Sequence, residues 1–222
     1  MQILDTTSLA ATLRNLEEAR LDALPAEDPA AKESLDWILS RQQEVRGYGP
    51  FFAATREDSD ERHPTLTGEH ANRSCTLLTL GTEAARALWV WGRRGGWPAE
   101  DAVLRIRDKG RTWPPRRVGY ICCEVCTVAR WRALLAARPD GWETALAAGL
   151  QELAERPLQD GGGWRKFAFC YTLMALAEMD LPEAEAQRRR VRSAAERALA
   201  ALGGNDAATR FRRRALKWAV GG

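Results

Sequence analysis

The chain has 222 residues, which is enough for one large domain or two small ones. Hydrophobic residues make up 45% of the chain, so it can build a core without needing a metal or disulfide bonds. The formal net charge is only +3, and so small a charge does not by itself indicate a nucleic-acid partner.

Apolar residues recur at helical spacing almost everywhere, beginning with two amphipathic helices over residues 8–24 and 30–43. Ser8 is a suitable N-cap for the first of them, because its hydroxyl can accept from a backbone N–H of the first turn. A long irregular segment follows over residues 45–66, and no segment of the chain has a convincing strand pattern.

Two short helices are expected next, over residues 67–81 and 82–92, with Gly81 or Thr82 capping the second. A further helix over 98–110 has proline in its first turn and acidic residues near its start. The remaining helices are expected over residues 122–138, 141–155, 163–179, 181–202 and 206–220.

A glycine followed by a large aromatic residue recurs along the chain, at Tyr48, Trp97, Trp142 and Trp164. The spacing matches one helical hairpin, a second hairpin and half of one, and repeats of about 20 to 50 residues indicate stacked hairpins. The helix at 163–179 is apolar on nearly all sides, and the next one is rich in arginine. This order predicts a buried inner helix followed by an exposed outer helix.

These patterns resemble a known superfamily. The stretches SLDWILSRQQ and DGGGWRKFAFCYTLMALAEMD, together with the Gly-aromatic turns, are similar to the hairpin repeats of prenyltransferases and squalene cyclases. The resemblance covers residues 30–180 and implies a complete or partial α/α toroid, in which inner helices line a cavity. We therefore expect an all-α single domain over residues 1–222, with an open helical solenoid as the alternative.

The resemblance also draws attention to several acidic residues. Class II terpene cyclases of this superfamily use an Asp-x-Asp-Asp motif, and the segment DSDE, which contains Asp58 and Asp60, departs from it at the last position. Basic neighbours would lower the pKa values of these carboxyl groups and oppose an acid role. Asp58 and Asp60 are the first two candidate catalytic residues, and Glu69 and His70, which lie near a helix start, are the other two. All four are expected near the mouth of the cavity. The alternative is a solvated charged loop.

The densest chemical signal is the segment CCEVC, in which Cys123 and Cys126 form a C-x-x-C pair at a helix start. Such a pair can reach one zinc ion, and Cys75 and His70 are the candidates for its remaining two ligands. A second interpretation is thiol chemistry, because a helix N-terminus acidifies a cysteine. A third is simple packing, since free cysteine packs as a small hydrophobe. All three interpretations remain open.

The C-terminal part is strongly basic, with ten Arg or Lys residues and two acids from Arg188 onward. Its arginines are expected to lie mostly in water on a helix surface, and the alternative is a contact with an acidic partner. The chain has no stretch of about 18 apolar residues, so no membrane span is expected. It starts without a signal-peptide pattern, and its five cysteines suggest reduced thiols in the cytoplasm.

Two functions follow from these patterns. The first is a cavity-bearing protein of the toroid type that acts on, or binds, an apolar or peptide-like small molecule. The second is a non-catalytic helical module that binds a ligand or a protein, with a structural zinc ion. Because acid–base candidates are few, binding is favoured slightly over catalysis, and whether the chain is an enzyme stays open.

Overall fold

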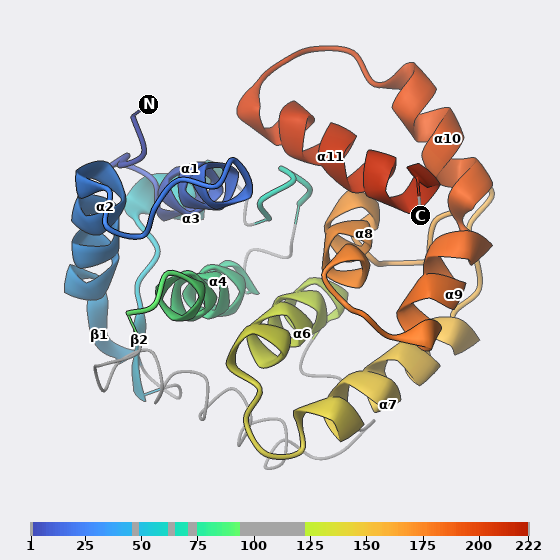
Figure 1. The fold of residues 1–222 in the computed structure, drawn as a ribbon, viewed down its shortest axis with the longest axis horizontal. Coiled ribbons are helices and arrows are strands. Elements are labelled where there is room, and N and C mark those ends of the chain that lie inside the picture. The colour runs from blue at the N-terminus through green and yellow to red at the C-terminus, as the bar shows by residue number, and fades with distance from the viewer. Residues whose placement is uncertain (1, 46–48, 62–64, 71–74, 94–122, 222) are drawn as a thin grey trace.

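The computed structural model describes residues 2–45, 49–61, 65–70, 75–93 and 123–221. Most of them are helical, which confirms the all-α class (Figure 1). The helix expected over 98–110 lies outside these residues, as do Tyr48 and Trp97 of the Gly-aromatic rhythm. The helices are α1 (Leu9–Leu21), α2 (Pro29–Ser40), α3 (Arg56–Glu61), α4 (Thr76–Val90), α6 (Glu124–Ala137), α7 (Trp142–Glu155), α8 (Phe169–Ala177), α9 (Pro182–Arg190), α10 (Arg192–Ala201) and α11 (Ala207–Gly221).

The sequence pattern missed one short element. Strands β1 (Gln42–Val45) and β2 (Gly49–Phe52) pair antiparallel where the sequence predicted the end of a helix and the start of an irregular segment, and α2 ends earlier than expected, at Ser40. Four-residue strands are too short for apolar alternation to stand out in the sequence. Phe51 and Phe52 are both buried, and β2 packs against α4, so the hairpin is held by its aromatic residues.

The prediction of two short helices over 67–81 and 82–92 is wrong, because a single helix, α4, runs through their expected junction. Gly81 lies inside α4, where a Cβ atom would come within 2.0 Å of the ring of Phe51. Thr82 does not cap a helix; its hydroxyl donates to the carbonyl of Leu78 one turn earlier, at 2.6 Å. The glycine therefore serves the close packing of the hairpin rather than a helix end.

Five helices form the inner layer of the molecule. Each of α1, α4, α6, α8 and α11 contacts the next in this order, and α11 contacts α1 again. Figure 1 shows these five helices around a common centre, with the α11 end of the chain returning beside the α1 end. The chain closes on itself in this way, so residues from both ends can meet on one surface.

The other helices pack outside this layer. Helix α2 lies against α1 and α4, α7 lies against α6 and α9, and α10 lies against α11. Trp131 of α6 is 1% exposed and fits against Gly149 of α7, where a Cβ atom would lie 2.4 Å from the indole nitrogen. A large flat side chain thus joins an inner helix to an outer one.

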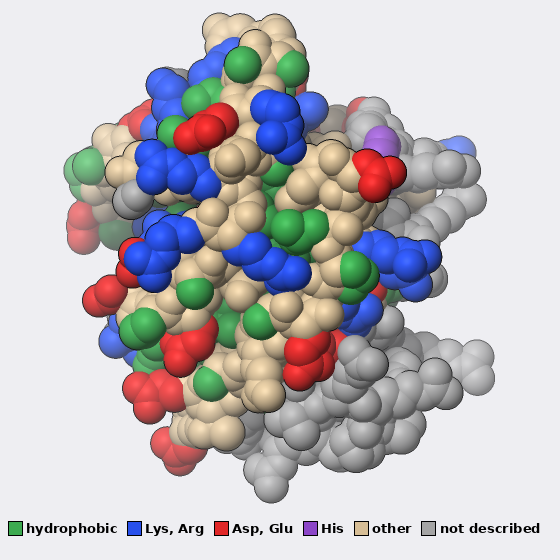
Figure 2. Space-filling model, turned by 90° about the vertical axis from the view of Figure 1, so that its right-hand side faces the viewer, with side chains coloured by type: hydrophobic (Ala, Val, Ile, Leu, Met, Phe, Trp, Pro, Cys, Tyr) green, Lys and Arg blue, Asp and Glu red, His purple; other side chains and the backbone are tan. Residues whose placement is uncertain are grey.

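The contrast between a buried and a charged helix is confirmed. Every residue of α8 from Cys170 to Leu176 is buried, although the helix starts at Phe169 rather than at residue 163. The charged segment that follows breaks at the buried Val191 into α9 and α10. Figure 2 shows basic and acidic side chains mixed over the face of the molecule that carries these outer helices. In the described part of the chain, no helix has the length and hydropathy needed to cross a bilayer.

Candidate functional site

Three cysteines meet where two helices begin. The sulfur atoms of Cys75, Cys123 and Cys126 all lie within 4.8 Å of one another. Cys75 is the N-cap residue of α4, Cys123 is the N-cap residue of α6, and Cys126 lies in the first turn of α6. The C-x-x-C pair and Cys75, which the sequence singled out as ligand candidates, are therefore brought together by the packing of α4 against α6.

The backbone around the cluster favours negatively charged sulfur. Both helices point their N-terminal ends, with their exposed amide dipoles, toward the three thiols, and such ends stabilise a thiolate. The hydroxyl of Thr79 lies 3.5 Å from the sulfur of Cys126, and this sulfur donates to the carbonyl of Cys75 at 3.8 Å. Thr79 is thus placed to donate to the sulfur if Cys126 becomes a thiolate.

The geometry fits a zinc ion after a small adjustment. A tetrahedral site with Zn–S bonds of about 2.3 Å separates its sulfurs by about 3.8 Å. The sulfur–sulfur distances in the cluster are at most 4.8 Å, so each sulfur would have to move inward by less than about 1 Å to bind the ion. Cys126 is fully buried, Cys75 is 8% exposed and Cys123 is partly exposed, so two of the three thiols are shielded from solvent as in closed structural sites. The cluster therefore offers three of the four ligands that a tetrahedral metal site needs.

The fourth predicted ligand, His70, does not belong to this group. Its side chain is exposed, and the cluster found among the described residues contains the three cysteines without it. Cys122 lies outside the described residues, next to Cys123 in sequence. Cys170 is buried elsewhere, on α8, where burial and the nearby Glu69 raise the pKa of its thiol far above the ordinary value. That environment disfavours the reactive thiolate form.

Asp58, the first residue of the predicted catalytic set, is 4% exposed and caps a helix from a distance in sequence. Its carboxylate accepts from the hydroxyl of Ser8 at 2.7 Å and from the backbone N–H groups of Leu9 and Ala10 at 2.9 and 3.1 Å. It also accepts from the backbone and side chain of Thr55. The carboxylate thus satisfies the orphan donors at the start of α1 and joins α3 to it.

Glu69 has the same kind of role at another helix. Its carboxylate accepts from the backbone N–H groups of Cys170 and Tyr171, at 3.1 and 2.8 Å, in the first turn of α8. Thr67 donates to it at 2.8 Å. The two acids therefore cap helices α1 and α8 rather than facing a common site. Asp60 belongs to α3, and its side chain lies outside the described part of the structure.

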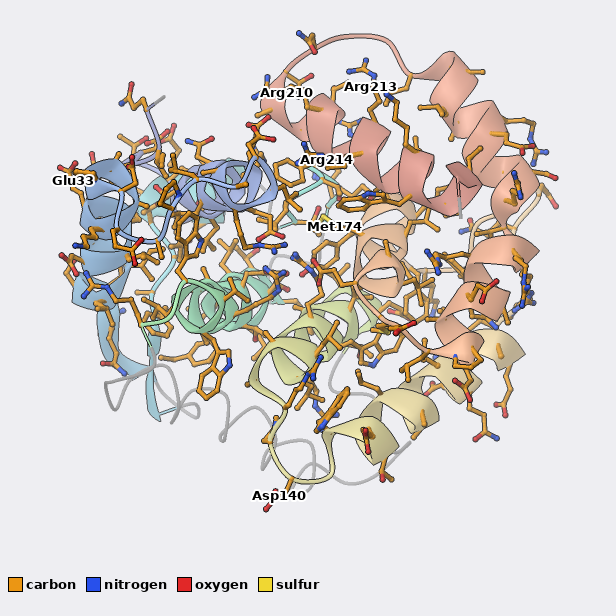
Figure 3. All side chains as sticks on the ribbon, in the orientation of Figure 1. Glu33, Asp140, Met174, Arg210, Arg213 and Arg214 are labelled. Atoms are coloured by element: carbon orange, nitrogen blue, oxygen red, sulfur yellow. The ribbon has the colours of Figure 1, made fainter. Side chains whose placement is uncertain are left out.

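A second cluster, which we call the ionic network, fills the space between α1, α4, α6 and α8. Figure 3 shows how densely side chains occupy this central region. Arg132 is completely buried and donates to the carboxylates of three residues: Glu83 at 2.5 Å, Glu178 at 2.8 Å and Glu17 at 3.1 Å. Arg86 donates to Glu17 and Glu178, each at 2.9 Å. The helices are thus joined by charge-assisted hydrogen bonds.

The charges of the ionic network balance. Burial alone would raise the pKa of Glu17, but Arg86 and Arg132 outweigh it and hold that pKa well below its usual range. Arg20, which is partly exposed, also pairs with Glu17 at 2.8 Å. With Arg20, the described members contain three arginines and three glutamates, so the network as a whole carries no net charge. Burial and Glu83 raise the pKa of Tyr171, whose hydroxyl stays protonated and donates to Glu83.

Sequence reasoning did not identify the ionic network, although two of its helices carry a signal. Glu83 and Arg86 stand three residues apart in an otherwise uncharged helix, and Arg132 follows a tryptophan in another. Charged residues on a helix with no polar face must either be paired or reach solvent. Their pairing across helices far apart in sequence requires the tertiary arrangement.

Comparisons of the chain with protein-family models, with curated proteins and with solved structures found no significant match. Function must therefore be inferred from the arrangement of the residues.

Proposed function

We propose that the protein is a non-catalytic helical binding module in which Cys75, Cys123 and Cys126 hold a structural zinc ion. The observation that supports this most directly is the meeting of three thiols within 4.8 Å, at the N-terminal ends of two packed helices. Thiolates are preferred zinc ligands, and three of them leave one of the four tetrahedral positions for a further ligand.

A zinc ion at this point would clamp two inner helices. Helices α4 and α6 are separated in sequence, and the ion would join the N-cap residue of α4 to the N-cap residue and first turn of α6. Because the ligands converge only in the folded chain, the free energy of metal binding would add to folding stability. Thr79 would then donate to a metal-bound sulfur and orient it, as outer-sphere groups do in other metal sites.

The positions of the acidic residues support a binding role over catalysis. Asp58 and Glu69 already accept several hydrogen bonds at helix N-termini, and both would have to give these up to act on a substrate. A general acid or base needs to reach the proton that it transfers. The buried acids Glu17 and Glu83 are likewise held by arginines.

The closed contact order of α1, α4, α6, α8 and α11 supports, in our proposal, a small α/α-toroid-like arrangement with outer helices around it. The ionic network occupies the space between four of these helices, where the cavity of a toroid enzyme would lie. A ligand or partner would therefore be bound at the surface of the module rather than at its centre.

The zinc proposal is tested by the metal content of the full chain, purified without chelator and measured by inductively coupled plasma mass spectrometry. We expect about one zinc per chain, and we expect Cys126→Ser to lose it because a serine hydroxyl is a poor zinc ligand. The matched control is Cys170→Ser, which removes a buried thiol that lies outside the cluster. Equal zinc in both variants would contradict the proposal.

A second readout guards against loss of zinc through misfolding. The unaltered chain is loaded with Co²⁺, whose visible absorption reports a tetrahedral site and whose near-ultraviolet absorption reports thiolate ligands. Both bands are expected, and His70→Ala should keep them because His70 lies outside the thiol group. Loss of the bands in His70→Ala would assign the fourth ligand to that residue, as the sequence predicted.

A further inference from the structure

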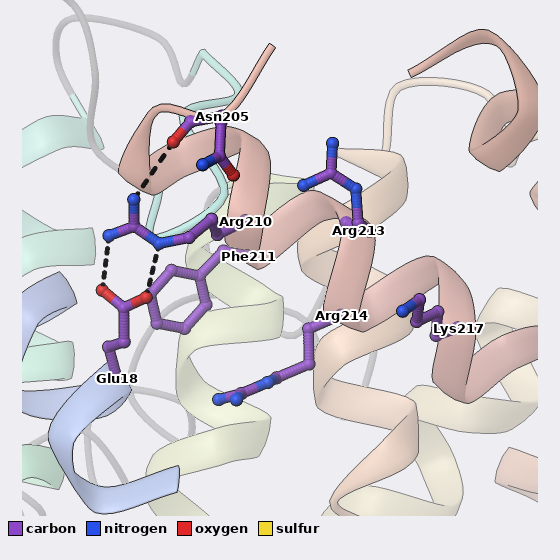
Figure 4. Close-up of a pocket in the computed structure, with 7 residues that line it drawn as sticks. All are labelled: Glu18, Asn205, Arg210, Phe211, Arg213, Arg214 and Lys217. Carbon is purple, nitrogen blue, oxygen red and sulfur yellow. Dashed lines mark hydrogen bonds and ion pairs between the residues drawn. The ribbon is translucent and has the colours of Figure 1, made fainter. Parts of the chain in front are cut away.

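A second feature, independent of the cysteines, lies on α11. Arg210, Arg213, Arg214 and Lys217 are spaced by three, four and seven residues from the first, so they follow one side of the helix. They line a surface pocket of about 280 Å³ at the junction of α11 with α1 (Figure 4). The pocket is completed by Glu18, Asn205 and Phe211.

The cations of this pocket fall into two classes. Arg210 forms a two-pronged pair with Glu18, at 2.6 and 2.8 Å, and Arg214 donates to Asp22 at 3.1 Å. Arg213 donates one hydrogen bond to the carbonyl of Gly204, which carries no full charge. In the parts of the chain that the structure describes, no carboxylate pairs with Arg213 or Lys217.

Such an arrangement costs stability when nothing is bound. Arg210 and Arg214, like Arg213 and Lys217, stand four residues apart, and like charges at this spacing repel each other and destabilise a helix. The acids of α1 relieve the repulsion at Arg210 and Arg214 only. An anion placed between Arg213 and Lys217 would relieve the repulsion between those two cations.

We propose that this pocket binds the phosphate group of a small phosphorylated molecule. The guanidinium group of Arg213 offers a planar fork of donors that matches two phosphate oxygens, and Lys217 offers a compact point charge beside it. Arg210 and Arg214 are fixed by their carboxylate partners, so they hold the walls of the pocket in place. Phe211, which is 2% exposed, gives it an apolar floor.

The dimensions and the neighbouring charges favour a compact anion over a nucleic acid. From Arg210 to Lys217 the helix rises only about 10 Å, at 1.5 Å per residue, which is too short to follow an extended phosphate backbone. Glu18 and Asp22 lie along the α1 side of the same surface, where they would repel a long polyanion. The net charge of the whole chain is only +3.

The test is a titration of the purified chain with inorganic phosphate at low ionic strength, followed by ³¹P nuclear magnetic resonance. We expect saturable binding at one site per chain. The double variant Arg213→Gln with Lys217→Gln should weaken the affinity at least about tenfold, which corresponds to roughly 1.4 kcal/mol. Circular dichroism of this variant should be unchanged, because both side chains lie at the surface.

The matched control is the double variant Arg189→Gln with Arg192→Gln. It removes the same charge from exposed positions on α9 and α10, outside the pocket, and it should bind phosphate as tightly as the unaltered chain. Equal weakening in both double variants would overturn the proposal in favour of a diffuse effect of net charge. Absence of saturable binding would overturn it as well, and so would tighter binding of a glutamate-rich peptide or a DNA duplex than of phosphate.

Discussion

Replacing Arg132 with methionine tests how the inner helices are held together. The side chain is completely buried and donates four hydrogen bonds to three carboxylates, on Glu17, Glu83 and Glu178. Methionine has a similar length and no charge, so the substitution removes the cation without leaving a large cavity. The remaining carboxylates then share one buried cation, Arg86.

The size of the effect follows from the buried charge that remains. Removing one partner of a buried ion pair destabilises a protein by about 3–5 kcal/mol, because the other partner is left without compensation. Since Arg132 serves three carboxylates, we expect the loss to lie at the upper end of this range. Adding Glu83→Gln to the variant removes one uncompensated charge and should restore part of the lost stability.

The assay is urea unfolding followed by circular dichroism, with Arg192→Met as the control. Arg192 forms an exposed pair with Glu196 one helical turn away, at 3.3 Å, and such pairs contribute about 0.3–0.5 kcal/mol. The two substitutions are chemically identical, so the difference between them isolates burial. A loss below about 1 kcal/mol for Arg132→Met would refute the view that this network joins the inner helices.

The pH dependence gives a further check on the same residues. Burial opposes the charged form of Glu17, but the arginines prevail and hold its pKa well below the ordinary value of about 4.3. The folded chain therefore binds fewer protons than the unfolded chain just below that pH. The stabilisation is complete above about pH 4.3 and is lost as the pH falls. The gap between the unaltered chain and Arg132→Met should narrow in acid.

Two smaller substitutions test the helix ends. Asp58→Ala should lower the free energy of unfolding by about 2 kcal/mol or more, because Asp58 accepts three hydrogen bonds at the start of α1 and two from Thr55. Ala in place of the exposed Glu57 should change it little. Arg190→Gln should lower the free energy of unfolding by about 1 kcal/mol, because Arg190 donates to the carbonyl groups at the end of α7. Arg189→Gln should change it by less than about 0.5 kcal/mol. Thermal unfolding of the paired variants measures both differences, and equal losses within a pair would contradict the contacts.

The helices were predictable because their signals are local. The cap at Ser8 and the apolar periodicity of α2, α6 and α7 all depend on residues that are close together in the sequence. The boundary at Gly81 was misjudged because a glycine inside a helix and one at its end look alike in the sequence. Only the ring of Phe51, about thirty residues away, shows why this glycine lies within α4.

The candidate site was predictable in part. Cys123 and Cys126 could be identified from their C-x-x-C spacing. Cys75 was a plausible further ligand because the chain contains few cysteines and histidines. The roles of Asp58 and Glu69 were not predictable, because each carboxylate caps a helix that lies about 50 or 100 residues away in sequence. The ionic network depends in the same way on contacts between distant helices.

Zinc K-edge X-ray absorption on the purified full chain would identify the atoms that surround the metal. Three thiolates from Cys75, Cys123 and Cys126 predict a shell of three sulfur atoms at about 2.3 Å and one lighter or further ligand. The Cys126→Ser variant should lose this spectrum or show fewer sulfur neighbours. A chain that carries no zinc, or zinc surrounded by nitrogen and oxygen alone, would contradict the account.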